Sequence, residues 1–272
     1  MARSTKILVA VLSGFALMAS VLPSAVLAKG PANVSATIHN FSTAGKASDG
    51  SDSQYRSQHS EVCVFCHTPH GGSLTGPLWN RPNPTTTWTH YDSQTLGSYL
   101  GGLAQNRAIS DESLMCMSCH DGSIYVNHLL NVPNVDPAKI TGAGGSDIEI
   151  IGFPALTRIG AGPSDPFGTG DLSDDHPISF SYDDVLLSSE YQAGGAKDGQ
   201  LRPVAFAESP TFSPGEGVRF FNKPMAGLGG NRVECSTCHD PHVEYDMGNP
   251  DYMPFLIMKN TGSNLCLACH NK

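Results

Sequence analysis

Apolar and polar positions alternate over only short distances in most of this chain. One long apolar run, "ILVAVLSGFALMASVLPSAVLA" (7–28), follows Arg3 and Lys6 and ends in Val-Leu-Ala. A charged start, an apolar middle and a small-residue end are typical of an export signal. We therefore expect residues 1–28 to be removed. A retained membrane anchor is disfavoured because Ser, Gly and Pro interrupt the run, and no later segment is apolar for long enough to span a bilayer.

After this run, periodic segments are few and short. A polar linker is expected at 42–58, and the stretch 136–175 is a Gly-, Pro- and Asp-rich insert. The pattern predicts a fold that is mostly coil with short α-helices and few short strands. Helices are expected at 93–103, 111–119 and the C-terminus, and strands at 148–153, 204–206 and 219–221.

The eight cysteines fall into four copies of one motif. Each copy reads C-x-x-C-H: Cys63, Cys66 and His67; Cys116, Cys119 and His120; Cys235, Cys238 and His239; Cys266, Cys269 and His270. This motif is the attachment signature of c-type haem, in which two thiols bond the macrocycle and the histidine binds the iron. Zinc sites and disulfides also use paired cysteines, but neither requires a histidine directly after the second one. The sequence predicts four covalently attached haems with His67, His120, His239 and His270 as proximal ligands.

Haem attachment also explains how such a chain folds. With 29 glycines and 19 prolines, the polypeptide has little periodic structure from which to build an apolar core. Each large apolar macrocycle supplies core that side chains can cover. We expect a haem-dense multihaem cytochrome c fold in which the haems form the core.

Two of the motifs carry a second histidine three residues further on. They read "CVFCHTPH" (63–70) and "CSTCHDPH" (235–242). Three residues span about 10 Å at most, and the intervening proline fixes the backbone. His70 and His242 therefore cannot reach around the macrocycle to the iron of their own motif. If they are ligands, each serves a different haem, which brings two haems close together.

These sites belong to an internal repeat of two halves, 29–135 and 176–272. Each half runs from a lone histidine near a phenylalanine, through C-x-x-C-H-x-P-H, to a plain C-x-x-C-H. Each half thus supplies two distal candidates, which are His39 and His70 in the first and His176 and His242 in the second. The reserve candidates are His128, His59 and His90. The methionines show no placement related to the repeat. Bis-histidine ligation predicts low reduction potentials.

The quoted motifs resemble the doubled-CXXCH multihaem cytochromes. "CVFCHTPHGG", "SCHDGS", "HPISF" and "CSTCHDPH" carry the resemblance. Four haems on an exported chain of this size resemble the outer-surface tetrahaem cytochromes, of the outer-membrane cytochrome E type, that polymerise into extracellular nanowire filaments. The resemblance implies a continuous chain of bis-histidine haems, with one axial histidine donated between subunits of a head-to-tail homopolymer. The insert 136–175 has no counterpart in this resemblance.

The net charge restricts the choice of partners. Loss of Arg3 and Lys6 with the export signal takes the formal charge from −9 to −11. This argues against nucleic acid or an anionic membrane surface as a partner. Other multihaem cytochromes and extracellular electron acceptors remain as redox partners.

Three functions are consistent with this sequence pattern. The first is a filament-forming electron conductor at the outer cell surface, the second a monomeric periplasmic electron shuttle, and the third a multihaem reductase. A reductase needs an open iron position, whereas this chain has enough histidines to fill every one and has no C-x-x-C-K variant. The expectation is an electron-transfer protein and not an enzyme.

Overall fold

The computed structural model describes residues 30–45, 57, 59–73, 76, 78–84, 87–104, 106–120, 129–131, 171–173, 175–222, 230–245 and 250–271. Within them the longest helix, α3 (Asp111–His120), has ten residues, and each strand has two. Turns and loops make up most of the rest. The prediction of mostly coil with short helices and few strands is confirmed. No helix in these stretches has the length and apolarity of a bilayer span.

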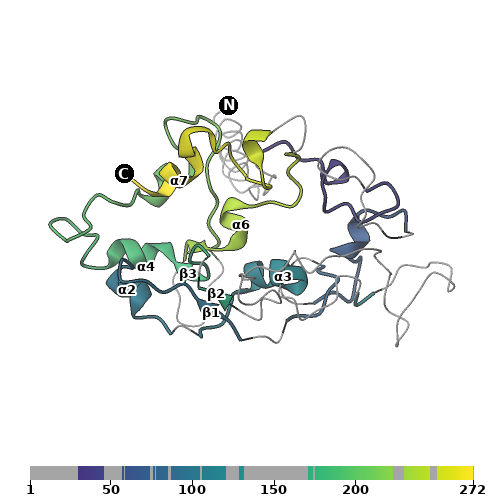
Figure 1. Ribbon diagram of the computed structural model, residues 1–272, viewed down its shortest axis with the longest axis horizontal. Coiled ribbons are helices and arrows are strands. Elements are labelled where there is room, and N and C mark those ends of the chain that lie inside the picture. The colour runs from purple at the N-terminus through teal and green to yellow at the C-terminus, as the bar shows by residue number, and fades with distance from the viewer. Residues whose placement is uncertain are drawn as a thin grey trace, which may run out of the picture.

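The regular elements follow one another in the order that Figure 1 labels. They are η1 (Val34–Ala36), η2 (Cys63–Phe65), β1 (Thr89–His90), α2 (Ser98–Gly101), α3, β2 (Asp171–Leu172), β3 (Phe180–Ser181), α4 (Tyr182–Leu187), α5 (Val204–Glu208), β4 (Arg232–Val233), α6 (Cys235–Cys238), η5 (Pro250–Tyr252), η6 (Thr261–Ser263) and α7 (Asn264–Cys269). Helix α3 packs against α6, α5 against α7, and α2 against α4.

Two small sheets tie distant segments together. Strands β1 and β2 pair in parallel, with Thr89 opposite Asp171. Strands β3 and β4 are antiparallel, with Phe180 opposite Val233. The second sheet leads directly into α6, which begins with a capping box between Glu234 and Thr237. Because a capping box satisfies backbone N–H groups at the first turn, it fixes the start of the third C-x-x-C-H motif.

The apolar side chains of the described residues form four separate clusters. The largest surrounds Phe180, Val218 and Ile257, and the smaller ones are built on Phe65, on Trp88 and on Val243. Thiols adjoin three of them: Cys269 packs on the first, Cys66 and Cys119 on the second, and Cys235 on the third. Four of the eight cysteines predicted to attach haem therefore lie beside apolar clusters.

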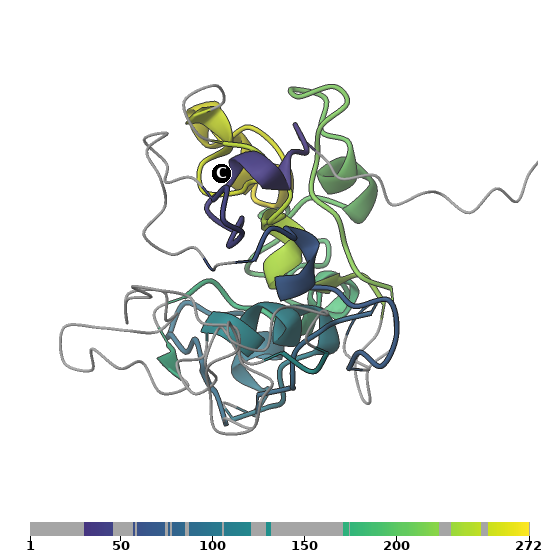
Figure 2. The ribbon, with the colours of Figure 1, turned by 90° about the vertical axis from the view of Figure 1, so that its right-hand side faces the viewer.

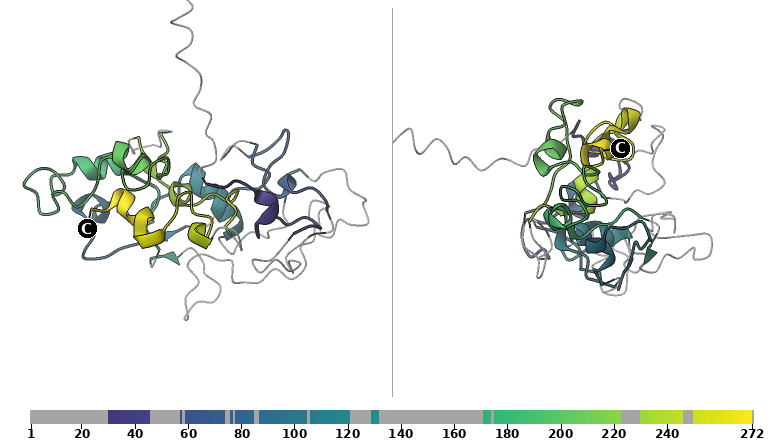
Figure 3. Two further views of the ribbon diagram at one scale, coloured as in Figure 1. Left: turned by 90° about the horizontal axis from the view of Figure 1, so that it is seen from above. Right: turned by 90° about the vertical axis from the view of Figure 1, so that its left-hand side faces the viewer.

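The segment 30–45 crosses from the N-terminus to the second half of the chain. Ala32 pairs with Val243, and the backbone N–H of Asn33 donates to the carbonyl of His242 at 2.7 Å. Figure 2 shows this segment, in purple, beside the yellow C-terminal region. The view from above in Figure 3 shows the same neighbourhood. The two halves are thus interleaved at this point.

The structure confirms some of the six expected elements and changes others. The helices expected at 111–119 and at the C-terminus are present as α3 and α7, and that at 93–103 is reduced to α2. The strand expected at 204–206 is wrong, because Val204–Glu208 form helix α5. Pro203 precedes this helix with φ −61°, and proline favours a helix start. At 219–221 only Phe221 pairs, with Arg232, and 148–153 lies outside the described residues.

Candidate haem-binding sites

The C-x-x-C-H motifs share one backbone turn. In the first, third and fourth motifs the histidine N–H donates to the carbonyl of the first cysteine, at 2.8 Å for His67, 3.0 Å for His239 and 2.8 Å for His270. The second motif forms the last turn of α3, which ends at His120. A single helical turn therefore presents two thiols and then a histidine in all four places.

None of the eight cysteines forms a disulfide. Three pairs of them bring successive motifs together. Cys66 is close to Cys119. The pKa of Cys66 is raised to about 12, mainly by burial and secondly by Cys119. Burial and the neighbouring Cys269 likewise raise the pKa of Cys238 to about 12. Between these pairs, the side chains of Cys116 and Cys235 are in hydrogen-bond contact. Neighbouring cysteine side chains thus link the motifs in the order one, two, three, four.

Among the described residues, three pairs of histidine rings lie at nearly the same distance from each other. The ring centroids of His67 and His242 are 6.3 Å apart, those of His39 and His120 are also 6.3 Å apart, and those of His176 and His270 are 6.4 Å apart. Each pair joins a motif histidine to one of the predicted distal candidates. All three pairs form within one chain.

This distance is what a metal between two imidazoles requires. An imidazole nitrogen lies about 2.0 Å from a bound metal and about 1.1 Å from the centre of its ring, so two rings on opposite sides of one metal have centroids about 6.2 Å apart. The observed 6.3–6.4 Å agree with this value. Together with the thiol pairs beside each motif histidine, the donor set fits c-type haem.

Hydrogen bonds hold several of these rings in the orientation that a metal ligand needs. The Nδ1 of His176 lies 2.9 Å from the carbonyl of Pro177, and that of His239 lies 2.8 Å from the carbonyl of Pro254. A carbonyl only accepts, so Nδ1 carries the proton and the lone pair of Nε2 is left for a metal. His242 is held in the same way by the carboxylate of Asp240 at 2.7 Å.

His39 is the most deeply placed of the distal candidates. Burial, followed by the neighbouring His120 and His242, lowers the pKa of His39 to about 3. Its Nδ1 is buried without a hydrogen-bond partner among the described residues. A neutral imidazole with an available lone pair is the form that binds a metal. His39 therefore has the protonation state of a ligand at neutral pH.

The remaining candidates lie apart from these pairs. His70 is exposed, and the ring contacts within the described stretches do not include it or His239. The Nδ1 of His59 accepts a hydrogen bond from the backbone N–H of Glu61 at 3.0 Å, which places the proton of the neutral ring on Nε2. The Nε2 of His90 donates to the carbonyl of Arg107 at 3.0 Å. His128 lies outside the described residues.

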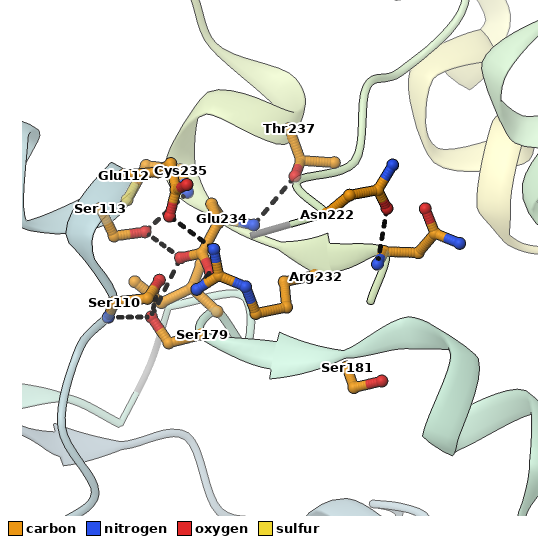
Figure 4. A network of polar contacts seen from close by, with 12 residues as sticks. Ser110, Glu112, Ser113, Ser179, Ser181, Asn222, Arg232, Glu234, Cys235 and Thr237 are labelled. Carbon is orange, nitrogen blue, oxygen red and sulfur yellow. Dashed lines mark hydrogen bonds and ion pairs between the residues drawn. The ribbon is translucent and has the colours of Figure 1, made fainter. Parts of the chain in front are cut away.

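A polar network that the sequence did not predict joins α3 to the third motif. Figure 4 shows Glu234 at its centre. Its Oε2 accepts from Ser113 at 2.6 Å and from Ser179 at 3.1 Å, and its Oε1 lies 3.3 Å from Arg232. Ser113 also accepts from the backbone N–H of Cys235 at 3.1 Å. The network fixes the position of Cys235 against α3, which carries Cys116.

Sequence reasoning also missed Asp240 and Arg219. Asp240 contacts both His242 and Arg219. One signal was available in the sequence, because the two C-x-x-C-H-x-P-H segments differ at x, with threonine in the first and aspartate in the second. Arg219 is distant in sequence and has no comparable signal.

Comparison with known families supports the haem assignment. The family described as "Doubled CXXCH motif" matches residues 229–272, which contain the third and fourth motifs. No curated protein matches the chain at a significant level. The motifs indicate covalent c-type haem binding. The chain has the features of a multihaem c-type cytochrome for electron transfer.

Proposed function

We propose that this protein is an exported tetrahaem c-type cytochrome that carries electrons along a chain of closely spaced bis-histidine haems. The observation that carries the proposal is the set of three histidine pairs, each with its ring centroids 6.3–6.4 Å apart. Each pair combines a C-x-x-C-H histidine with a histidine from elsewhere in the chain. This repetition favours one ligation scheme used at every site.

The ligand sets follow from these pairs and from the internal repeat. His67 and His242 hold the first haem, His39 and His120 the second, and His176 and His270 the fourth. His242 lies three residues after His239 and serves the first motif of the other half. The repeat assigns the equivalent role to His70, which then serves His239 on the third haem.

Bound haem iron supplies reversible one-electron chemistry at a potential set by its axial ligands and surroundings. Two imidazoles of this protein would hold each iron, and two cysteines would fix each macrocycle. An iron held by two imidazoles would offer a substrate no place to bind. This favours electron transfer over a reductase function, and it favours low potentials.

The thiol neighbours support a continuous path through the four sites. Cys66 and Cys119 connect the first and second motifs, Cys116 and Cys235 the second and third, and Cys238 and Cys269 the third and fourth. A thiol bonds to the edge of its macrocycle, so neighbouring thiols bring macrocycle edges together. The chain of haems then runs in sequence order, and the contact of Cys116 with Cys235 joins the two halves.

The proposal extends to export and to assembly into an extracellular filament. The N-terminal signal and the acidic mature chain support export of a protein that meets external acceptors. Resemblance to the outer-surface tetrahaem cytochromes supports head-to-tail polymerisation, in which a non-closing contact generates a filament. A monomeric periplasmic shuttle is the second candidate, and the pairing of His39 with His120 of the same chain favours it.

Mass spectrometry and imaging of material from the producing cells test these statements. The expected mature chain begins near Lys29 and carries the mass of four haems, with only low-spin absorbance. Electron microscopy of the extracellular fraction is expected to show filaments. Discrete particles of one subunit in the periplasmic fraction would leave the shuttle as the function, and a bare polypeptide mass without a Soret band would reject both.

A further inference from the structure

The two C-x-x-C-H-x-P-H segments place different groups between their histidines. In the first, the Oγ1 of Thr68 donates to the backbone carbonyl of His70 at 2.9 Å. In the second, the Oδ1 of Asp240 lies 2.7 Å from the Nδ1 of His242 and also accepts from its backbone N–H at 3.0 Å. Of these two sites, the second puts a carboxylate on the imidazole.

Asp240 is fixed in this position from its other side as well. Its side chain is only 5% exposed, and its Oδ2 forms an ion pair with Arg219 at 3.1 Å. Arg219 is anchored in turn by donation from its Nε to the carbonyl of Ser236 at 2.8 Å. The group facing His242 is therefore a carboxylate whose second oxygen is held by the guanidinium of Arg219.

A carboxylate acts on an imidazole more strongly than a carbonyl does. His176 and His239 donate from Nδ1 to the carbonyls of Pro177 and Pro254, which are neutral acceptors. Hydrogen bonds to an ionised acceptor are roughly twice as strong as neutral ones. The carboxylate draws the Nδ1 proton and makes the ring a more basic ligand. A more basic ligand stabilises the oxidised iron, so the reduction potential falls.

We infer that Asp240 is a positioning residue that lowers the reduction potential of the haem held by His67 and His242, and that Arg219 limits this effect. The inference rests on the proposed ligand sets. The repeat relates the haem served by His242 to the haem served by His70. The inference gives these two haems different reduction potentials. Asp240 acts through His242, and Arg219 acts through Asp240.

The test is a potentiometric titration of the holoprotein followed by its absorbance at fixed pH. Asp240→Asn keeps the size of the side chain and removes its charge. We expect one of the four reduction steps to shift upward by about tenfold in its equilibrium constant, which is about 59 mV for one electron. Asp198→Asn is the matched control, because it removes one negative charge from an exposed loop residue whose carboxylate accepts from the backbone of Gly194. We expect no comparable shift there.

Two further variants keep the inference testable if Asp240→Asn impairs assembly. Arg219→Gln removes the cation that competes for the carboxylate, so the same reduction step is expected to shift downward. Lys197→Gln, which removes a cation paired with Glu190 instead, is its control. Asp240→Glu restores an anion and is expected to return the step toward the value of the natural protein. Haem content per chain and the low-spin ferric EPR signals are recorded for every variant.

The outcomes separate this inference from the proposed function. Suppose that all haems stay low-spin and that Asp240→Asn shifts the reduction step no more than Asp198→Asn does. The effect of Asp240 on the reduction potential is then overturned, and the ligand sets stand. An upward shift on Arg219→Gln would also overturn it. If the natural protein lacks low-spin bis-histidine signals, the proposed function itself fails, whatever the variants do.

Discussion

The imidazole of His39 lies against the phenyl ring of Phe255, with the two centroids 4.4 Å apart. Phe255 belongs to the second half of the chain, whereas the histidine paired with His39, His120, belongs to the first. His39 is thus held between two halves of one polypeptide. Donation of His39 to a neighbouring subunit would require it to leave both contacts.

His39→Ala is the direct test of this assignment. Removal of the imidazole leaves His120 as the one axial ligand of its haem, so we expect one of four haems to become high-spin and to bind CO when reduced. Added imidazole should restore the low-spin spectrum. Visible absorbance and a CO titration of the purified holoprotein give the measurement. Fully low-spin absorbance with no CO binding would contradict the role of His39.

The assembly state of the same variant separates the filament from the shuttle. If His39 is donated between subunits in a filament, His39→Ala is expected to yield single subunits by light scattering. If His39 serves its own chain, the size of the particles should not change. Phe255→Leu provides a milder control, because it loosens the packing of His39 but leaves the ligand in place.

The ligand of the third haem is predicted from the repeat, and His70→Ala tests it. His242→Ala is expected to expose the first haem to CO, and His70→Ala the third. The double variant should therefore bind two CO molecules per chain. His59→Ala is a matched control, because the Nδ1 of His59 already accepts from Glu61. A single CO per chain in the double variant would mean that another histidine, such as His128, completes the third site.

The haem-attachment residues are predicted from the sequence because the chemistry of thioether attachment fixes their spacing. Two thiols and a histidine must lie within one helical turn, and the four C-x-x-C-H motifs do so. The coil-rich fold was predictable for a similar reason, since 29 glycines and 19 prolines leave few long elements. Local constraints of this kind are visible in a single sequence.

The pairing of distal ligands could not be read in the same way. His67 and His242 are 175 positions apart, and nothing local distinguishes the histidine that meets His67 from the other candidates. The network around Glu234 is equally hidden, because Ser113, Ser179 and Arg232 come from three separate segments. The strand predicted at 204–206 was wrong for a local reason. A run of three apolar residues fits a strand or a helix, and here a helix follows Pro203.

His90 should make the stability of the folded protein depend on pH. Burial, followed by the charge of Arg107, lowers the pKa of His90 from 6.5 to about 4. Between these values the unfolded chain binds a proton that the folded chain does not, so the free energy of unfolding rises with pH there. Stability is thus expected to fall as the pH drops from 6.5 toward 4, by up to about 3 kcal/mol.

Thermal unfolding of the holoprotein between pH 7 and pH 4 measures this dependence. His90→Gln keeps a donor for the carbonyl of Arg107 but has no proton to gain, so its curve of stability against pH should be flatter. The two curves should therefore be closest near pH 7 and separate toward pH 4. Parallel curves for the natural protein and the variant would show that His90 is not the group responsible.

Arg232 should contribute strongly to the junction of the two halves, because it is buried between Glu112 and Glu234. Its contacts to them measure 2.7 and 3.3 Å, and its side chain is 2% exposed. Arg232→Met would leave the carboxylate of Glu234 buried without its cation, which costs about 3–5 kcal/mol in comparable buried pairs. Lys197→Met removes a cation from the partly exposed pair with Glu190, and such pairs are worth about 1 kcal/mol or less.

Adding Glu234→Gln to Arg232→Met removes the carboxylate that has lost its cation. The thermal unfolding midpoint of the double variant should therefore recover part of the decrease caused by Arg232→Met. If the double variant loses the sum of the two single effects, Arg232 and Glu234 act independently and the network does not hold the halves together as a unit.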